Sequence, residues 1–236
     1  MLIAAIVLAG GRGSRVRSRV NKVFLPVQDR VVVEYSVRTF KSEARVARIV
    51  VAIRPEDRYR LDHLTAAAGF DAMTLVAGGS TRHSSEIAAI ESLATDIEAG
   101  TIDLVAIHDG ARPFMTLGLL DACIEAANRF GGAVPGLPPE GPLYEIDEGR
   151  ARALAAAVMR VQTPQVFRAR PLLEAYRMSV EAGFEGVDTA ETIEKFSTLA
   201  VAVVPGDPRN IKITFLEDLF HAEELAERWR EGRWEG

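Results

Sequence analysis

Three short apolar segments dominate the hydrophobic pattern of the chain. They are residues 3–8, residues 48–53 and residues 103–107, and each is rich in branched apolar side chains and is followed by turn residues. Continuous apolar runs of this length are too short for a buried helix and indicate strands that are covered on both faces, as in a parallel sheet. The pattern therefore predicts buried parallel strands at these three places.

Between these segments the apolar residues recur at helical spacing. One stripe comprises Val32, Val33, Tyr35, Ser36, Val37 and Phe40, a second comprises Ile87, Ile90 and Leu93, and a third comprises Leu119, Leu120, Cys123, Ile124 and Ala127. Strands that alternate with helices at this pitch form βαβ units with right-handed crossovers. We therefore expect an α/β fold with a mostly parallel sheet.

The pattern changes after Gly131. Residues 132–134 predict another strand, and prolines and glycines then crowd residues 135–142, where no helix can continue. Residues 143–147 and 150–158 read as two strands joined by a turn that contains Gly149. Without repeats or a low-complexity linker, we expect one domain over residues 1–236 with a protruding arm at about 135–158. Such an arm favours a homodimer.

The C-terminal third predicts one more strand and a final helix. The strand covers residues 201–204, and Thr214 is expected to cap a helix whose apolar face includes Leu216 and Leu219. The tail over residues 228–234 is expected to fray, because terminal residues lack tertiary contacts unless they are tied down.

Composition narrows the class of protein. The 236 residues are 48% hydrophobic and 26% charged, which is typical of a soluble globular protein and excludes intrinsic disorder. A net charge of −5 disfavours a general nucleic-acid binder, which needs a basic surface. No stretch approaches the ~20 apolar residues of a membrane span. The single cysteine, Cys123, cannot form an internal disulfide, so we expect a reducing, cytoplasmic setting.

A glycine-rich, cationic segment follows the first predicted strand. Gly10 and Gly11 permit close backbone approach to an anion. Up to residue 28 the chain carries no acid and five cations, namely Arg12, Arg15, Arg17, Arg19 and Lys22. This concentration of positive charge predicts a polyphosphate ligand. The segment has neither the Gly-Lys-Ser/Thr of a Walker loop nor a third glycine for a dinucleotide fingerprint. The alternative is a turn with solvated arginines.

A carboxylate lies where the third predicted strand ends. Asp109 follows His108 and precedes Arg112 and Pro113. Ligands of open α/β sheets bind outside the carboxyl ends of the strands, so Asp109 is expected to face the same crevice as the glycine segment. A carboxylate there can hold Mg²⁺ together with substrate phosphates. The alternative is a turn aspartate without a metal.

Two further loops carry candidate residues. In the small, polar loop over residues 78–85, Gly79, Ser80 and Ser85 could read the edge of a base. The alternative is that Ser84 or Ser85 caps a helix that begins near Glu86. In the segment 210–214, Lys212 stands in a strand-like pattern and would share a face with Asn210 and Thr214. The alternative there is a solvent-facing lysine.

These four loops, in this order and at these distances, resemble the family of 2-C-methyl-D-erythritol 4-phosphate cytidylyltransferases. The family's motifs stand here as Ala9–Arg15 with Lys22 seven positions further on, as His108–Pro113, as Thr163–Gln165 and as Asn210–Thr214. The resemblance covers Ala4 to about Leu225. It implies a doubly wound, mostly parallel sheet of the Rossmann-like nucleotidyltransferase type, with a β-arm.

The resemblance also implies an activity and a set of roles. The activity is the Mg²⁺-dependent transfer of CMP from CTP to a polyol phosphate, with release of pyrophosphate, in isoprenoid precursor synthesis by the non-mevalonate pathway. The implied roles are catalytic for Arg15 and Lys22, nucleotide-binding for Ala9, Gly10, Gly11, Gly79, Ser80 and Ser85, and acceptor-binding for Asp109, Arg112 and Lys212, with Asp109 also the metal ligand.

The acceptor side departs from the family pattern. Ala155, eight positions before Thr163, stands where the pattern has an arginine that holds the acceptor phosphate, and Val187 stands where it has threonine. The family's arm carries an Asp-Thr pair, whereas residues 138–142 of this chain contain no threonine. Each lost charge-assisted partner typically costs ~1.5–3 kcal/mol. Arg152 or Arg160 could replace the missing arginine.

Three hypotheses stay open at this point. The first is the transfer to methylerythritol phosphate, and the second is the same transfer to another acceptor such as ribitol phosphate. The third is a nucleotide-binding paralogue without catalysis. Arg15, Lys22 and Asp109 favour an active enzyme, whereas Ala155 and Val187 favour the other two.

Overall fold

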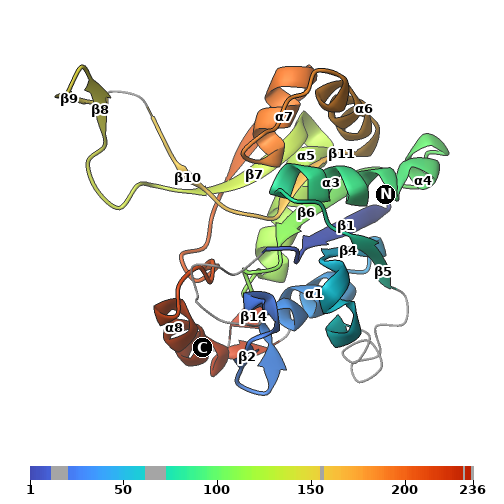
Figure 1. The fold of residues 1–236 in the computed structure, drawn as a ribbon, viewed down its shortest axis with the longest axis horizontal. Coiled ribbons are helices and arrows are strands. Elements are labelled where there is room, and N and C mark those ends of the chain that lie inside the picture. Colours follow the sequence, from blue (N-terminus) through green and yellow to red (C-terminus); the bar gives the residue numbers. More distant parts are fainter. Residues whose placement is uncertain (12–20, 62–72, 155–156, 231, 235–236) are drawn as a thin grey trace.

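A computed structural model describes residues 1–11, 21–61, 73–154, 157–230 and 232–234 of the chain. Among these residues, eight strands form one sheet in the order β10-β7-β11-β6-β1-β4-β5, with β12 paired to β7 (Figure 1). The strands are β1 (Ile3–Leu8), β4 (Val46–Ile53), β5 (Met73–Ala77), β6 (Leu104–Asp109), β7 (Gly131–Leu137), β10 (Arg160–Val161), β11 (Gln165–Arg168) and β12 (Ala200–Pro205).

The sheet is mostly parallel, as predicted. β1 lies between β4 and β6 and is parallel to both, and β5 and β12 are parallel to their neighbours β4 and β7. β11 is antiparallel to β6 and to β7, between which it lies. The hydrophobic pattern missed β5 and β11. β5 is a half-buried edge strand, and β11 is only four residues long with polar residues at both ends, so neither shows a continuous apolar run.

Helices cover both faces of this sheet. The described helices are α1 (Val32–Ser42), α3 (Arg82–Glu91), α4 (Ala94–Glu98), α5 (Leu117–Phe130), α6 (Ala169–Glu181), α7 (Thr189–Phe196) and α8 (Glu217–Ala226), with short 3-10 helices η2 (Lys22–Phe24) and η3 (Pro55–Asp57). Of these, α8 packs on a separate small core around Phe114. None of the described helices is long and apolar enough to cross a membrane.

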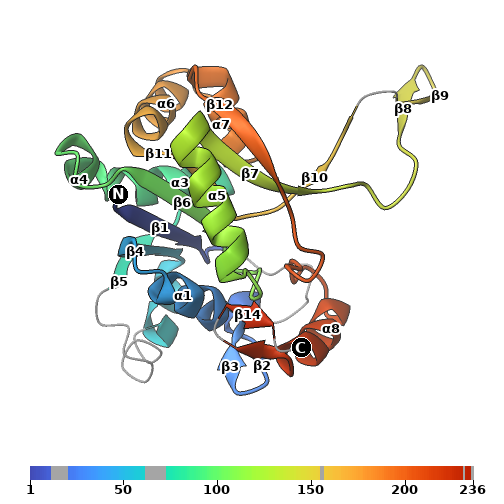
Figure 2. The same cartoon turned by 180° about the vertical axis from the view of Figure 1, so that it is seen from behind.

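The alternation of side chains along β1 shows why two faces must be covered. Ile3, Ala5 and Val7 enter a core with α1 and α5, whereas Ala4 and Ile6 enter a second core with α3 and α6. α3 lies in front of the sheet in Figure 1, and α5 lies in front of it in the opposite view of Figure 2. This arrangement is the expected doubly wound fold, and the predicted core position of Cys123 in α5 is confirmed.

A two-stranded hairpin extends from the ends of β7 and β10. Its strands β8 (Tyr144–Asp147) and β9 (Arg150–Ala153) are antiparallel and exposed along their whole length. Glu148 and Gly149 form the turn with positive φ angles of 47° and 79°. The hairpin stands apart from the rest of the molecule in both views (Figures 1 and 2), which agrees with the predicted two-stranded excursion.

The prediction that Thr214 caps the last helix is wrong. α8 begins at Glu217, and the Oγ1 of Thr214 donates to the carbonyl of Lys212 instead. The carboxylate of Asp218 accepts the backbone N–H groups of Thr214 and Phe215 at 2.6 and 2.8 Å. The segment before the helix is therefore fastened by an acid in the first helical turn.

The predicted fraying of the tail is also wrong. Two short strands, β13 (Trp229–Arg230) and β14 (Arg233–Trp234), pair with each other, and Trp229 is buried. The Trp229 ring lies 5.5 Å from Phe114 and 4.8 Å from Trp234 between centroids. A second small sheet, in which β2 (Pro26–Val27) pairs with β3 (Arg30–Val31), borders the same core around Phe114. Aromatic burial thus ties the tail down.

Candidate active site

A cavity of about 560 Å³ lies at the carboxyl ends of β1, β4, β5 and β6. Its lining includes these predicted residues: Gly10, Gly11, Lys22, Gly79, Ser80, Ser85, Asp109 and Lys212. The four loops singled out in the sequence therefore meet at one place, as expected for an open α/β sheet. Of the other predicted residues, Ala9 and Arg112 lie behind the lining, and Arg15 falls outside the described residues.

Asn21 fixes the path of the chain around Ala9 and Lys22. Its Nδ2 donates to the carbonyl of Ala9 at 2.7 Å and to Asp57 at 3.1 Å, and its Oδ1 accepts the N–H of Val23. The N–H of Ala9 donates to the carbonyl of Ala52 at 2.8 Å, so both backbone groups of Ala9 are engaged within the chain. Asn21 thereby anchors η2 beside the end of β1.

Lys22 reaches across the cavity. Its Nζ donates to the carbonyl of Ile213 at 2.6 Å, which joins the segment after β1 to the segment that carries Lys212. The two lysines therefore border the same cavity although they are far apart in sequence. Lys212 lies in an irregular segment and not in a strand, because the described residues 211–214 pair with no strand.

The loop over residues 78–81 leads directly into α3. α3 begins at Arg82, with Thr81 as its N-cap, so a helix start near Glu86 capped by Ser84 or Ser85 is wrong. Thr81 and Ser84 form a capping box, in which each side chain accepts the other's backbone N–H. Ser85 Oγ donates to the carbonyl of Thr81 and accepts the N–H of Gly79 at 3.1 Å. Gly79 is required here, because an added Cβ would lie 2.2 Å from Ser84 Oγ.

Asp109 lies among three cationic side chains. Lys212 Nζ is 2.6 Å from Oδ2, Arg82 Nε is 3.4 Å from Oδ1, and Arg112 Nε is 3.9 Å from Oδ2. Burial raises the pKa of this carboxyl, but the charges of Lys212 and Arg82 outweigh burial and hold the pKa well below its usual range. Asp109 is therefore ionised at every physiological pH, and its charge gathers cations at the mouth of the cavity.

The residue beside it, His108, fixes the backbone at this point. Its Nε2 lies 2.9 Å from the carbonyl of Arg112, which can only accept, so Nε2 carries the proton. Nδ1 then accepts from Thr163 Oγ1 at 3.0 Å, and the same Oγ1 accepts the N–H of Asp109 at 3.1 Å. This chain of hydrogen bonds orients Asp109 from behind.

Arg112 lies behind the residues that line the cavity and supports the site from there. Its guanidinium donates to the carbonyl of Asn210 at 2.8 Å, and Asn210 Nδ2 donates to the carbonyl of Thr163. Burial lowers the pKa of Arg112, and the nearby charge of Asp109 opposes that effect. Arg112 therefore holds the segment before Lys212 in place.

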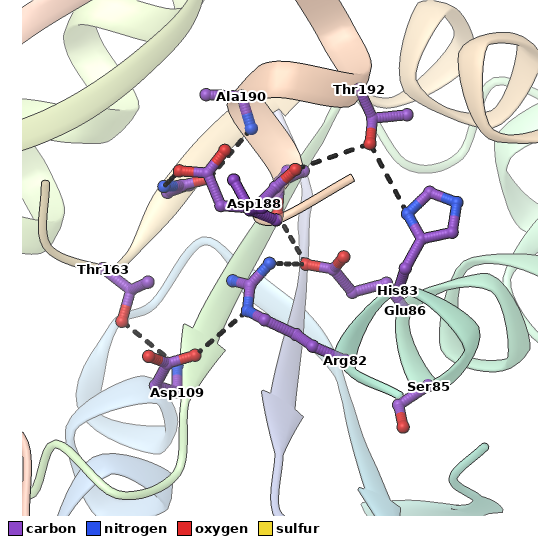
Figure 3. A network of polar contacts seen from close by, with 12 residues as sticks. Arg82, His83, Ser85, Glu86, Asp109, Thr163, Asp188, Ala190 and Thr192 are labelled. Carbon is purple, nitrogen blue, oxygen red and sulfur yellow. Dashed lines mark hydrogen bonds and ion pairs between the residues drawn. The ribbon is translucent and has the colours of Figure 1, made fainter. Parts of the chain in front are cut away.

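Sequence reasoning missed Arg82 as a site residue. It lines the cavity, and its guanidinium lies between the carboxylates of Asp109 and Glu86 (Figure 3). The signal was available in part, because Arg82 belongs to the loop singled out for Gly79, Ser80 and Ser85. Its partners belong to distant elements, which no local pattern indicates. Arg54, after β4, also lines the cavity and pairs with Asp57 at 2.7 Å.

His108 predicts a dependence of stability on pH. Burial lowers its pKa to about 4, whereas a histidine in an unfolded chain titrates near ~6.5. Between these values the unfolded chain binds more protons, so the stabilisation is complete above pH ~6.5 and is lost as the pH falls toward 4. We expect this group to lower the free energy of unfolding by about 1 kcal/mol between about pH 7.5 and about pH 5.5.

Urea denaturation at both pH values measures this effect. The pKa of His83 is lowered by burial as well, so it contributes equally to the parent and to a His108→Gln variant. The variant should therefore lose less stability on acidification than the parent. An identical loss in both proteins would contradict the assignment to His108.

The fold and the site together define a class of enzyme, the nucleotidyltransferases. The doubly wound sheet, the glycine loops at its strand ends and the lysines Lys22 and Lys212 at one cavity match what a nucleoside triphosphate requires. Comparison with known families is more specific. The model of the 2-C-methyl-D-erythritol 4-phosphate cytidylyltransferase (IspD) family matches residues 3–228, and this chain belongs to that family.

Individual proteins of known name are similar to this chain over nearly its whole length. The 2-C-methyl-D-erythritol 4-phosphate cytidylyltransferase of Geobacillus kaustophilus is 33% identical over 234 residues, covering 96% of this chain and 98% of the relative. That of Cereibacter sphaeroides is 34% identical, with coverages of 95% and 97%.

Solved structures show the same fold. The 4-diphosphocytidyl-2C-methyl-D-erythritol synthase of Anaerococcus prevotii superposes with a TM-score of 0.83 at 26% identity, covering 96% of each chain. The Thermus thermophilus cytidylyltransferase gives 0.72 at 32% identity, covering 96% of this chain and all of that one.

Proposed function

We propose that this protein transfers CMP from CTP to 2-C-methyl-D-erythritol 4-phosphate and releases pyrophosphate, a step of isoprenoid precursor synthesis by the non-mevalonate pathway. The observation that carries the proposal is the meeting of four separate loops at one cavity, where Arg82 and Lys212 contact Asp109 and Lys22 lines the same cavity. The relatives named above carry the acceptor in their names.

In the proposed reaction, an oxygen of the acceptor's phosphate attacks the α-phosphorus of CTP in line. The bond from that phosphorus to the β-phosphate oxygen breaks, and the electron pair leaves with pyrophosphate. Lys22 and Arg15 stabilise the charge that develops on the α-phosphate and the leaving group, and positioning with electrostatics supplies the rate enhancement. The loops of Gly10 with Gly11, and of Gly79 with Ser80 and Ser85, hold the nucleotide.

The acceptor is proposed to lie on the side of Asp109, Arg112 and Lys212. Lys212 is half exposed at the cavity and can contact an anionic or hydroxyl group while it remains close to Asp109. Arg112 acts from behind, through Asn210 and the charge of Asp109. The acceptor is therefore proposed to bind beside Asp109 and Lys212.

Magnesium is part of this proposal, as an ion that CTP carries. The described residues contain no group of three His, Cys, Asp or Glu side chains that could hold a metal by themselves. Asp109 offers one ionised carboxylate at the cavity, and Mg²⁺ commonly combines one or two carboxylates with substrate phosphates. The residues present therefore fit an ion held mainly by the triphosphate, with Asp109 as its protein ligand. When bound, it would neutralise phosphate charge.

We further propose a homodimer formed through the arm. β8 and β9 expose apolar side chains, among them Tyr144 and Ile146, that no described part of this chain covers. Arg152 belongs to the arm and Arg160 to β10 at its base, and both lie outside the lining of the cavity in their own chain. In a dimer, the arm can bring one of them to the partner's acceptor side.

Arg152→Ala and Arg160→Ala test this replacement of the missing arginine. We expect one of the two variants to raise the KM of the acceptor about 10-fold or more, because a lost charge-assisted contact costs ~1.5–3 kcal/mol, while the KM of CTP stays unchanged. Arg150→Ala, at the start of β9 in the hairpin, is the control. An unchanged acceptor KM in both variants would reject the idea.

The setting is proposed to be cytoplasmic. Cys123 is a free, buried cysteine, and burial raises the pKa of its thiol to about 12. The thiol therefore stays protonated and unreactive, and it forms no disulfide that would call for an oxidising compartment.

A different polyol phosphate is the second candidate acceptor. Val187, where the family pattern has threonine, is 81% exposed, and its N–H donates to Glu191. An exposed valine cannot supply the hydroxyl of a threonine to a phosphate. This position therefore favours an acceptor that needs fewer contacts there.

Pyrophosphate release from CTP with Mg²⁺ tests the function. The assay compares 2-C-methyl-D-erythritol 4-phosphate with a panel of polyol phosphates that includes ribitol 5-phosphate, and thermal shift measures CTP binding in parallel. We expect the highest kcat/KM with methylerythritol phosphate. A higher value with another polyol phosphate would favour the second candidate. Stabilisation by CTP without turnover on any acceptor would indicate a binding protein.

A further inference from the structure

A carboxylate that the proposed mechanism does not use lies just behind the cavity. Glu86 of α3 is completely buried, yet each of its oxygens has a partner. Oε1 accepts from Arg82 Nη1 at 2.5 Å and from Thr189 Oγ1 at 2.6 Å, and Oε2 accepts from Tyr176 at 2.8 Å. Glu86 thus connects α3 with α6 and with the start of α7.

Stability alone does not explain a buried acid at this position. Removing a carboxylate from water is costly, and well-packed apolar residues usually stabilise a core as well as or better than a buried ion pair does. Glu86 also borders the apolar core, because the neighbouring α3 residues Ala89 and Ile90 belong to the core between the sheet and α6. The charge therefore has another use.

Arg82 shows what that use is. Its guanidinium contacts Glu86 on one side, and its Nε lies 3.4 Å from Asp109 Oδ1 on the other (Figure 3). Burial lowers the pKa of Arg82, but the charges of Glu86 and Asp109 outweigh it and raise the pKa. Lys212 occupies the second oxygen of Asp109. Without Glu86, Asp109 would be the one described carboxylate left in an ion pair with Arg82, and Arg82 would compete with Lys212 for it.

We propose that Glu86 is a positioning residue for the transfer reaction, which holds Arg82 at a fixed place between the nucleotide loop and Asp109 and so keeps Lys212 available to the acceptor. The inference rests on the proposed function, since it assigns a consequence in that reaction. Thr189 and Tyr176 orient the carboxylate, so the start of α7 and the end of the nucleotide loop are coupled through one side chain.

Two substitutions of Glu86 test the proposal. Glu86→Gln keeps the shape and removes the charge, and Glu86→Met replaces the acid with an apolar group of similar length. We expect each to lower kcat about 10- to 100-fold, as misplacement of a neighbouring catalytic group does, with the KM of CTP within about twofold of the parent value. A merely structural role would change the melting temperature and leave kcat per folded molecule unaltered.

Glu91→Gln is the matched control. Glu91 lies on the same helix and also pairs with an arginine, Arg177, but at the surface. Its kcat should equal that of the parent. The two Glu86 variants are expected to share the same loss of kcat even if their melting temperatures move in opposite directions.

A relocated carboxylate provides a rescue. Thr189 Oγ1 and Arg82 Nη1 contact the same oxygen of Glu86, so Thr189→Asp places an acid within reach of Arg82 from the other side. The double variant Glu86→Gln, Thr189→Asp should recover part of the lost kcat. The logarithm of its kcat should regain at least a third of the difference between Glu86→Gln and the parent. Parental kcat in either folded Glu86 variant, or no recovery in the double variant, would overturn the proposal. A parent without turnover would overturn the proposed function and this role together, whereas an active parent with unaffected variants overturns this role alone.

Discussion

We expect Asp109→Asn to lower kcat/KM for the transfer reaction about 10³-fold. The substitution keeps the shape of the side chain and removes the charge that Lys212, Arg82 and Arg112 share. Those cations then repel one another around a neutral amide, and Lys212 loses its partner at 2.6 Å. Loss of one preorganised electrostatic group in an active site typically costs ~10²–10³ in rate, and here a proposed Mg²⁺ ligand is lost as well.

The same substitution should lower the free energy of unfolding by roughly 2 kcal/mol. Breaking a fully buried ion pair costs more, but Lys212 is 42% exposed, so solvent screens part of the loss. Steady-state kinetics and urea denaturation measure the two effects separately. Asp103→Asn, just before the same strand, is the control, since Asp103 is half exposed and pairs with the N-terminus. Parental kcat/KM in a folded Asp109→Asn protein would refute the assigned role.

Lys22→Met carries the second-largest expected effect, a fall in kcat of about 10²- to 10³-fold. The ammonium group of Lys22 borders the cavity and is proposed to stabilise charge on the phosphates as it develops. An interaction that strengthens toward the transition state lowers kcat when it is removed and changes the affinity for CTP much less. Calorimetric titration with CTP should therefore give a Kd within about fivefold of the parent.

Lys22 also has a structural partner far away in the sequence, since its Nζ donates to the carbonyl of Ile213 at 2.6 Å. A shift of the segment that carries Lys212 is thus a second route to lower activity, and it would raise the KM of the acceptor. Lys22→Arg separates the two routes, because it retains a positive charge and a donor. Partial activity in Lys22→Arg with an unaltered acceptor KM would support the phosphate role. Lys41→Met, an exposed position of α1, serves as the control. Equal losses of kcat and of CTP affinity in Lys22→Met would show that Lys22 acts in ground-state binding.

The site could be predicted from sequence to the extent that it is made of strand ends. Gly10 follows one apolar run and Asp109 ends another, and parallel strands bring their carboxyl ends to one edge of the sheet. Gly79 was singled out by its small, polar loop, because β5 before it has no continuous apolar run. Lys212 could be placed there through the resemblance of its motif, since its own surroundings in sequence suggested a strand that does not form. The roles of Arg82 and Glu86 could not be identified from sequence. Glu86 takes two of its partners, Tyr176 and Thr189, from α6 and α7, and these meet it only when both helices pack against α3.

The sequence by itself determined the buried strands, the helices with clear apolar stripes, the glycine loops and the family motifs. These features depend on neighbours within a few positions, where side-chain periodicity and backbone freedom act directly. The tertiary structure alone decided the antiparallel insertion of β11, the burial of Trp229 and the place of Glu86, whose partners Tyr176 and Thr189 are 90 and 103 positions away. Buried charges and aromatic rings take their surroundings from whichever distant segments pack against them, and no local pattern of residues encodes that choice.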